Sequence, residues 1–152
     1  FNYSPALKQS QWVWTRERLA DTPARELECL VSDCDPLPLA DATATRVVST
    51  EVIEHLFSPH LLPRFAHGCL KPGGHLVITT PYHGYLKNVA LAVMNKWDHH
   101  HTALWHGGHI KFWSRRTLSE LLEQNGFKVV GFSGVGRLPF LWKSMVVVAQ
   151  RA

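Results

Sequence analysis

The chain has 152 residues, of which 45% are hydrophobic and 18% charged, a composition that describes one globular domain and excludes disordered and collagen-like proteins. A domain of this size needs neither a disulfide framework nor a structural metal in order to fold. The formal net charge of +4 permits an anionic ligand or a membrane surface, but the basic residues are scattered, which argues against a nucleic-acid partner.

Two short strands are expected in the first third of the chain. Residues 26–32 (ELECLVS) form the first strand, which ends at Asp33. Residues 46–49 (RVVS) form the second, and the β-branched Val47 and Val48 suit burial on both faces of a sheet. The alternation of strand-like and helix-like segments from here onward predicts a layered α/β domain.

Helices are predicted after the second strand. Thr50 caps the first of them, and Glu51 and Glu54 lie in its first turn, where the helix dipole favours negative charge. On such a helix His55 lies one turn after Glu51 and faces the same crevice. A second helix is predicted over residues 61–70, where apolar residues recur at helical spacing before a Lys-Pro-Gly-Gly stop signal.

The clearest strand and the clearest helix lie further along the chain. Residues 75–80 (HLVITT) are a near-continuous apolar run, which is typical of a central parallel strand. The helix covers residues 117–124, where Thr117 and Glu120 can form a capping box. Gly126 can end this helix in the left-handed conformation.

Two further strands, over residues 128–132 and 144–149, complete the predicted elements. The connection between them contains Pro139 and is too short for a crossover helix, so the pair is expected to be antiparallel. The elements together predict an α/β domain with a mostly parallel sheet and an antiparallel last strand. Residues 1–152 form a single domain in this prediction, with an irregular N-terminal segment over residues 1–25.

Residues 82–114 differ from the rest of the chain. They are dense in His, Trp and Gly and have no regular period across their length, so we expect an inserted lid over a binding site. Residues 85–97 could form an amphipathic helix within it. Packing in the core is the commoner use of such an apolar stripe, and contact with a membrane surface and a lipid-like acceptor is the alternative. The stripe comprises Leu86, Val89, Ala90, Val93 and Met94.

The sequence carries no signal for export or membrane insertion. No apolar run approaches the length of a membrane span, and the N-terminus lacks the basic start and apolar stretch of a signal peptide. Cys29, Cys34 and Cys69 have spacings that fit neither a zinc ribbon nor a redox pair. We therefore expect reduced thiols and a cytoplasmic location.

Two motifs are specific enough to suggest a family. Residues 47–56 (VVSTEVIEHL) and 70–81 (LKPGGHLVITTP) strongly resemble the class I S-adenosylmethionine-dependent methyltransferases, and more narrowly the group that includes the ubiquinone-biosynthesis O-methyltransferases. In that family a strand leads into a helix carrying Glu-His-Leu, and Leu-Lys-Pro-Gly-Gly precedes the next strand. The resemblance extends over residues 26–150 and implies a Rossmann-like fold with S-adenosyl-L-methionine as the cofactor.

One feature departs from the family pattern. The family binds its cofactor at a first strand, a Gly-rich turn and a helix. The ten glycines of this chain begin only at Gly68, so we expect the first βαβ unit to be missing. Gly131, Gly134 and Gly136 are grouped, but no helix follows them, which favours a flexible turn over a cofactor loop.

The resemblance also assigns cofactor-binding residues. It implies that Asp33 accepts a hydrogen bond from the adenine amino group and that the backbone amide of Cys34 contacts the cofactor; a turn-forming role is the alternative for Asp33. Ser49, Thr50 and Glu51 lie at the carboxyl end of a predicted parallel strand, where open α/β sheets bind ligands. They would contact the methionine end of the cofactor, and helix capping is their competing role.

Two histidines are candidates for a catalytic general base. His83 follows the central strand, which places it beside the transferred methyl group if the family geometry holds, and its ordinary pKa of about 6.5 suits deprotonation of a hydroxyl acceptor. His109 ranks equally with His83. For His55, a structural role, in which the ring hydrogen-bonds a neighbouring loop, is commoner than a catalytic role. The residues assigned to substrate binding are His55, Tyr82, Trp105 and Trp113.

The lid also contains donors of the kind that bind metal ions. They are Asp98, His99, His100, His101, His106 and His109. Adjacent histidines cannot all point one way, so we predict no metal and favour a polar and aromatic lid that closes over a substrate. Its aromatic residues are Trp97, Trp105, Phe112 and Trp113.

These predictions lead to three functional hypotheses. The leading one is a methyltransferase that moves the methyl group of S-adenosylmethionine to an oxygen of a small molecule, with nitrogen or carbon as the lesser alternatives. This displacement needs positioning and desolvation more than elaborate acid-base machinery. Its rival is a non-catalytic methyltransferase-like remnant that acts as an interaction module. A single-stranded nucleic-acid binder that uses the aromatic lid is the weakest hypothesis.

Overall fold

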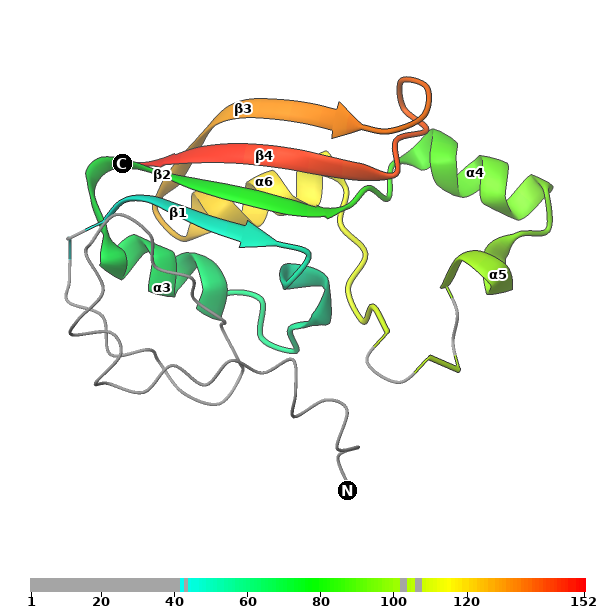
Figure 1. Cartoon of the computed structure of the whole chain (residues 1–152), viewed down its shortest axis with the longest axis horizontal. Helices are drawn as coiled ribbons and strands as arrows, with labels where there is room; N and C mark the ends of the chain where they lie inside the picture. The colour runs from blue at the N-terminus through cyan, green and yellow to red at the C-terminus, as the bar shows by residue number, and fades with distance from the viewer. Residues whose placement is uncertain (1–41, 43, 102–103, 106–107) are drawn as a thin grey trace.

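The computed structural model describes residue 42 and residues 44–101, 104–105 and 108–152 (Figure 1). The strand predicted over residues 26–32, together with Asp33 and Cys34, lies outside these residues, as does His106. The fold and the site below are built from the described part of the chain.

The described strands form one four-stranded sheet in the order β1-β2-β4-β3. They are β1 (Ala44–Thr50), β2 (Leu70–Pro81), β3 (Phe127–Val135) and β4 (Ser144–Arg151). β1 and β2 are parallel, whereas β4 is antiparallel to both β2 and β3. β1, β2 and β3 therefore run in one direction and the last strand runs in the other, which confirms the predicted fold class.

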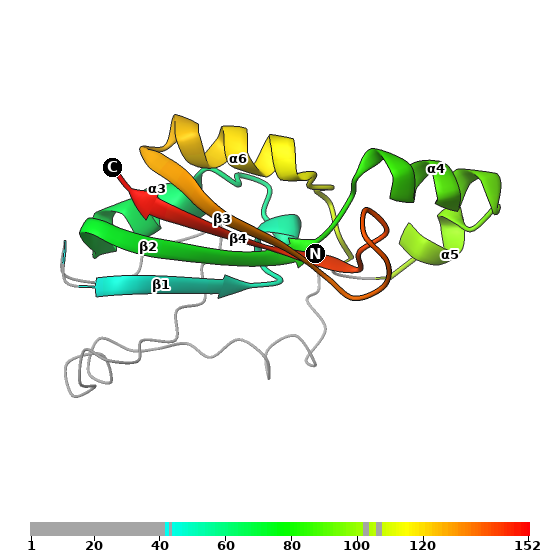
Figure 2. The same ribbon diagram turned by 90° about the horizontal axis from the view of Figure 1, so that it is seen from above.

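Two helices, α3 (Leu61–Cys69) and α6 (Arg115–Gln124), cover the same face of this sheet (Figure 2). Along β2, Leu76, Ile78 and Thr80 are buried and alternate with less buried residues, because successive side chains of a strand point to opposite faces. The helices contribute a matching set of buried apolar side chains, which includes Leu62, Ala66, Leu118, Leu121 and Leu122. The core therefore lies between the helices and one face of the sheet.

Val48 does not share this burial, contrary to the prediction that β1 is buried on both faces. Val47 packs against the core, but the side chain of Val48 is 60% exposed. The two side chains point to opposite faces of β1, and α3 and α6 cover only one of those faces (Figure 2).

The helix predicted after β1 is reduced to a single 3-10 turn, η1 (Ile53–His55). Glu51 has φ +52, a left-handed conformation that interrupts a helical path from Thr50, and Leu56 is already extended. The capping role predicted for Thr50 is wrong, because the residue that precedes η1 is Val52.

Helix α6 begins two residues earlier than predicted because Ser114 is its N-cap. The amide of Thr117 donates to Ser114 Oγ at 3.2 Å, and the amide of Ser114 donates to Thr117 Oγ1 at 3.1 Å. The capping box therefore joins Ser114 to Thr117 rather than Thr117 to Glu120. Gly126, at φ +82, has the predicted left-handed conformation after the helix.

Removing this cap should destabilise the protein measurably. We expect Ser114→Ala to lower the free energy of unfolding by about 1 kcal/mol, because the Thr117 amide loses its acceptor. Urea denaturation measures this change. Ser119→Ala, within the same helix, is the control and should not destabilise, because alanine is the better helix former. An equal loss for both variants would contradict the assignment of the cap.

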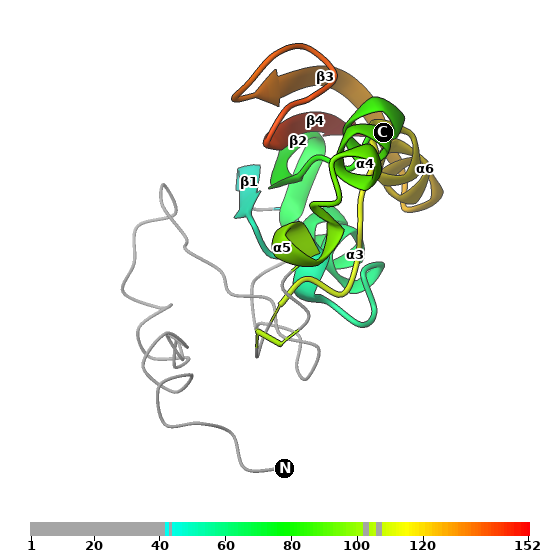
Figure 3. The ribbon, with the colours of Figure 1, turned by 90° about the vertical axis from the view of Figure 1, so that its right-hand side faces the viewer.

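The predicted lid contains two helices, α4 (Tyr85–Val93) and α5 (Trp97–His101), and α4 covers most of the amphipathic helix that the sequence suggested over residues 85–97. They lie beyond the end of the sheet, which Figure 3 views from that side. The apolar stripe of α4 does not pack in the core as expected: Val93 is 82% exposed, whereas Lys87 and Leu91 are buried. At this end of the molecule α4 has no sheet face to cover, so its apolar side stays outward.

Candidate functional site

The polar residues expected to bind ligands lie where β1 and β2 end. Carboxyl ends of parallel strands meet at one edge of a sheet, and open α/β sheets bind ligands there. Thr50 is in register with Thr79, and the amide of Glu51 donates to the Thr79 carbonyl at 3.0 Å. The end of β1 is therefore fixed beside the last residues of β2.

Ser49 differs from its two neighbours at this edge. Its side chain is 7% exposed, and its Oγ has no hydrogen-bond partner among the described residues. A buried hydroxyl is normally paired, so this oxygen is suited to a ligand or a water. Thr50 and Glu51 are exposed. The contact of these three residues with a cofactor stays a prediction.

Glu54 joins η1 to two other segments. Its side chain is 1% exposed, and its Oε2 accepts a hydrogen bond from Thr80 Oγ1 at 2.9 Å. Its backbone carbonyl accepts from the amides of Ile110 and Lys111, at 2.9 and 3.0 Å. Burial raises the pKa of the Glu54 carboxyl, and the hydrogen bonds oppose that rise only in part.

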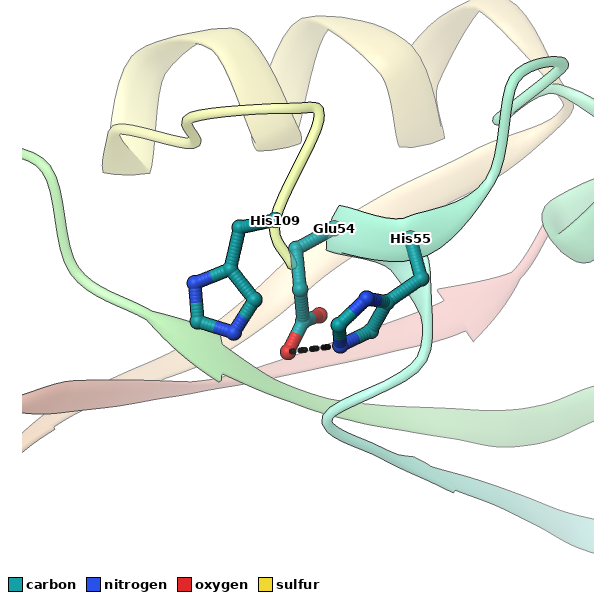
Figure 4. Close-up of side chains that lie close together, drawn as sticks. All are labelled: Glu54, His55 and His109. Carbon is teal, nitrogen blue, oxygen red and sulfur yellow. Dashed lines mark ion pairs between the residues drawn. The ribbon is translucent and has the colours of Figure 1, made fainter. Parts of the chain in front are cut away.

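Glu54, His55 and His109 form the tightest group of ligating side chains in the described residues (Figure 4). One donor atom from each lies within 4.8 Å of the other two. Within the described part of the chain, Glu54 Oε1 has no hydrogen-bond partner, and it lies 4.0 Å from His55 Nε2. The rings of His55 and His109 meet edge to face, with centroids 4.9 Å apart.

This group has two chemical capabilities. One carboxylate and two imidazoles are a suitable donor set for a divalent cation, and the same groups can accept and pass on a proton. Of this group, only His109 was among the metal donors expected from the sequence; Glu54 and His55 were not. Its available signal was the adjacent pair Glu54 and His55, but only the fold brings His109 to them.

The two predicted bases have different surroundings. His109 is partly exposed, and burial lowers its pKa, with the nearby His55 as a further cause. His83 is 7% exposed, and burial lowers its pKa to about 3, with the charge of Lys87 as the next cause. Both imidazoles are therefore neutral at pH 7, but His83 is much the weaker base.

The residues predicted to bind substrate do not gather in one place. Tyr82 and Trp113 form an isolated β-bridge and are 8% and 9% exposed, so they belong to the core. The Tyr82 ring packs edge to face on Trp142, and Trp113 Nε1 donates to the Ile53 carbonyl at 3.4 Å. Trp105 is 59% exposed, and its ring centroid lies 6.1 Å from that of His109. Of these three aromatic residues, Trp105 is therefore the one accessible to a ligand.

A family model described as a methyltransferase domain matches residues 2–131. The chain belongs to this methyltransferase family. The family resemblance read from the two sequence motifs is therefore confirmed, and the class is that of the S-adenosylmethionine-dependent enzymes. No curated protein sequence matches the chain, so the narrower likeness to the ubiquinone-biosynthesis group stays a prediction.

Solved methyltransferase structures share the fold. One is a complex between the Haloferax volcanii Trm112 methyltransferase activator and a methyltransferase, with 18% identity, a TM-score of 0.60, and coverage of 88% of this chain and 65% of that one. Another is a Bacillus halodurans methyltransferase, with 14% identity, a TM-score of 0.56, and coverage of 76% and 73%. A third is a Burkholderia thailandensis 1,6-didemethyltoxoflavin-N1-methyltransferase with bound S-adenosylhomocysteine, with 15% identity, a TM-score of 0.53, and coverage of 73% and 45%.

This chain spans only part of the length of these solved structures. It spans 65% of the length of the Haloferax chain and 45% of the Burkholderia enzyme. Among the described residues, no helix is long and apolar enough to cross a membrane.

Proposed function

We propose that this methyltransferase-family chain takes part in the transfer of a methyl group from S-adenosylmethionine to an oxygen of a small molecule. The observation that carries the proposal is the group Glu54, His55 and His109 beside the carboxyl ends of β1 and β2. A proton acceptor at this edge of the sheet is what an alcohol or phenol acceptor needs.

The residues at this edge fit the cofactor. The buried, unpartnered Oγ of Ser49 can hydrogen-bond its methionine portion, with Thr50 and Glu51 beside it. S-adenosylmethionine, when bound, supplies an electrophilic methyl group on a sulfonium. The cofactor residues Asp33 and Cys34 remain part of the proposal from sequence alone.

The chain's own residues then manage the acceptor's proton. His109 accepts it, because its imidazole is neutral at pH 7, partly exposed and a stronger base than His83. Glu54, fixed by Thr80 and by its own backbone carbonyl, orients His55 against the His109 ring. Trp105 and the rest of the lid exclude water from the acceptor.

Titration with S-adenosylmethionine tests the proposal. We expect the cofactor to stabilise the chain against thermal unfolding, by about 2.7 kcal/mol at a hundredfold excess over its dissociation constant. Ser49→Val should weaken binding by roughly fivefold, because one hydrogen bond is lost. ATP, which has the adenosine without the methionine, is the control ligand and should stabilise the chain less.

The opposite result would support another function. If millimolar S-adenosylmethionine gives neither binding heat nor thermal stabilisation, the chain as given is not a cofactor-binding enzyme and the interaction-module hypothesis is favoured. Two observations are consistent with that hypothesis: a structural relative was solved together with a protein activator, and β3 is an edge strand of the described sheet.

A peripheral membrane contact is a further part of the proposal, because α4 presents Leu86, Val93 and Met94 outward.

A further inference from the structure

Lys87 is a buried cation that the mechanism above does not use. It lies on the inward side of α4 and is 3% exposed, as is the neighbouring Leu91 at 6%, although the apolar stripe residues Leu86, Val89 and Val93 of the same helix are exposed. Its Nζ donates to the Tyr82 carbonyl at 2.6 Å. An ammonium group has three N–H donors, and that carbonyl is the one acceptor that the described residues provide.

The charge of Lys87 is not compensated. The ion pairs of the described residues are those of Glu54 with His55 and of Glu120 with Arg116, so no carboxylate pairs with Lys87. The groups that it faces carry the same sign or none, and a buried charge without a partner is costly. These groups are Arg137 on the β3–β4 connection, His83 after β2, His100 and His101 on α5, and His109.

Three other buried polar atoms in this region, His83 Nε2, His101 Nε2 and Asn88 Oδ1, make no hydrogen bond of normal geometry with the described residues. Asn88 still interacts with His83, because its side chain partly opposes the fall in the pKa of that histidine. The rings of His83 and His101 are stacked, with centroids 5.6 Å apart, and Asn88 is the next residue to Lys87 on α4. Buried polar atoms are normally paired, so such a concentration indicates a place for a polar ligand group.

Two aromatic rings, those of Phe112 and Trp97, lie beside the same histidines. The Phe112 ring lies 5.0 Å from that of His83 and 4.8 Å from that of His101, measured between centroids. The ring centroid of Trp97 lies 4.3 Å from that of His101. A ligand that enters here meets flat apolar surfaces beside the ammonium and the imidazoles.

We infer that Lys87 and His83 bind a carboxylate group of an aromatic ligand at the end of β2. The ammonium donates its remaining N–H groups to the carboxylate, and His83 donates through Nε2–H. The inference rests on the proposed function in one respect, namely that the ligand is the methyl acceptor. Lys87 and His83 hold the carboxylate of this acceptor, and its hydroxyl group points toward His109. The acceptor class is therefore an aromatic hydroxy acid.

Benzoate and benzamide are the probes, since they have nearly the same shape and differ in charge. We expect the 152-residue chain to bind benzoate more tightly than benzamide by NMR titration. Lys87→Met should raise the benzoate dissociation constant by about tenfold or more, because a charge-assisted hydrogen bond is lost. Lys87→Arg should retain most of the affinity. Lys96→Met, at an exposed lysine after α4, is the matched control and should bind benzoate like the wild type.

Two results would overturn the inference: equal affinity of the wild type for benzoate and benzamide, or undiminished benzoate binding by Lys87→Met. The first comparison needs no variant, so it decides even if Lys87→Met does not fold. A parallel titration with S-adenosylmethionine separates this inference from the proposed function. Cofactor binding without a preference for benzoate refutes only the carboxylate site, and the reverse pattern refutes only the cofactor-dependent function.

Discussion

Acidification from pH 7 to pH 4 should destabilise the wild-type chain more than a His83→Gln variant, by on the order of 3 kcal/mol. The pKa of His83 is about 3 in the folded chain, because the ring is buried and lies near Lys87. In the unfolded chain it returns to about 6.5. The unfolded state therefore binds a proton between these two values that the folded state does not. The stability is fully present above pH 6.5 and is lost as the pH falls toward 3.

Urea denaturation of both proteins across this pH range measures the difference. The comparison must be made with a variant, because Glu54 acts in the opposite direction: burial raises its pKa, so its contribution is present at low pH and is lost as the pH rises through the folded value. That contribution is common to both proteins. His99→Gln, at an exposed histidine of α5, is the control and should follow the wild type. Parallel stability curves for wild type and His83→Gln would show that His83 is not buried as described.

Leu76→Ala should lower the free energy of unfolding by about 3 kcal/mol, because it leaves a cavity in a close-packed interior. Leu76 is fully buried in the central strand β2, between Val47 of β1 and Ala149 of β4. Leu104→Ala makes the same chemical change at a side chain that is 97% exposed, and it should alter stability by less than about 0.5 kcal/mol.

Chemical denaturation of the two leucine variants gives the comparison directly. A loss for Leu76→Ala no greater than that for Leu104→Ala would mean that β2 does not lie at the centre of the core. A loss of several kcal/mol confined to Leu76 supports the burial of this face of β2 beneath the helices, where Leu76 belongs to the same core cluster as Leu62 and Leu118.

Much of the described fold could be predicted from the sequence because burial leaves a periodic pattern. The strands β2 and β4 and the helices α3 and α6 each have one buried side, and that side repeats at the spacing of a strand or a helix. The prediction of a helix after β1 was wrong for a local reason. Glu51 adopts a left-handed conformation that is uncommon for a residue with a side chain, and no pattern of apolar residues signals it.

The same periodicity misled the prediction for α4. An apolar stripe indicates only which side of a helix is apolar, and it was natural to place that side in the core. In the structure most of this apolar stripe is exposed, and the side of α4 that is buried carries Lys87, which donates to the Tyr82 carbonyl at the end of β2. The sequence also predicted only part of the candidate site. The strand-end rule indicated the correct edge, but the contact of His109 with Glu54 and His55 depends on chain folding over many residues.

The backbone carbonyl of Glu54 has a consequence for how the two histidines are held. It accepts the amides of Ile110 and Lys111, the residues that directly follow His109, while His55 directly follows Glu54 itself. Main-chain bonds therefore hold the backbones of the two histidines together, and the bond from Thr80 to the carboxyl of the same glutamate ties that unit to the end of β2. The spacing of the two histidine backbones and their distance from the strand end therefore depend on one residue.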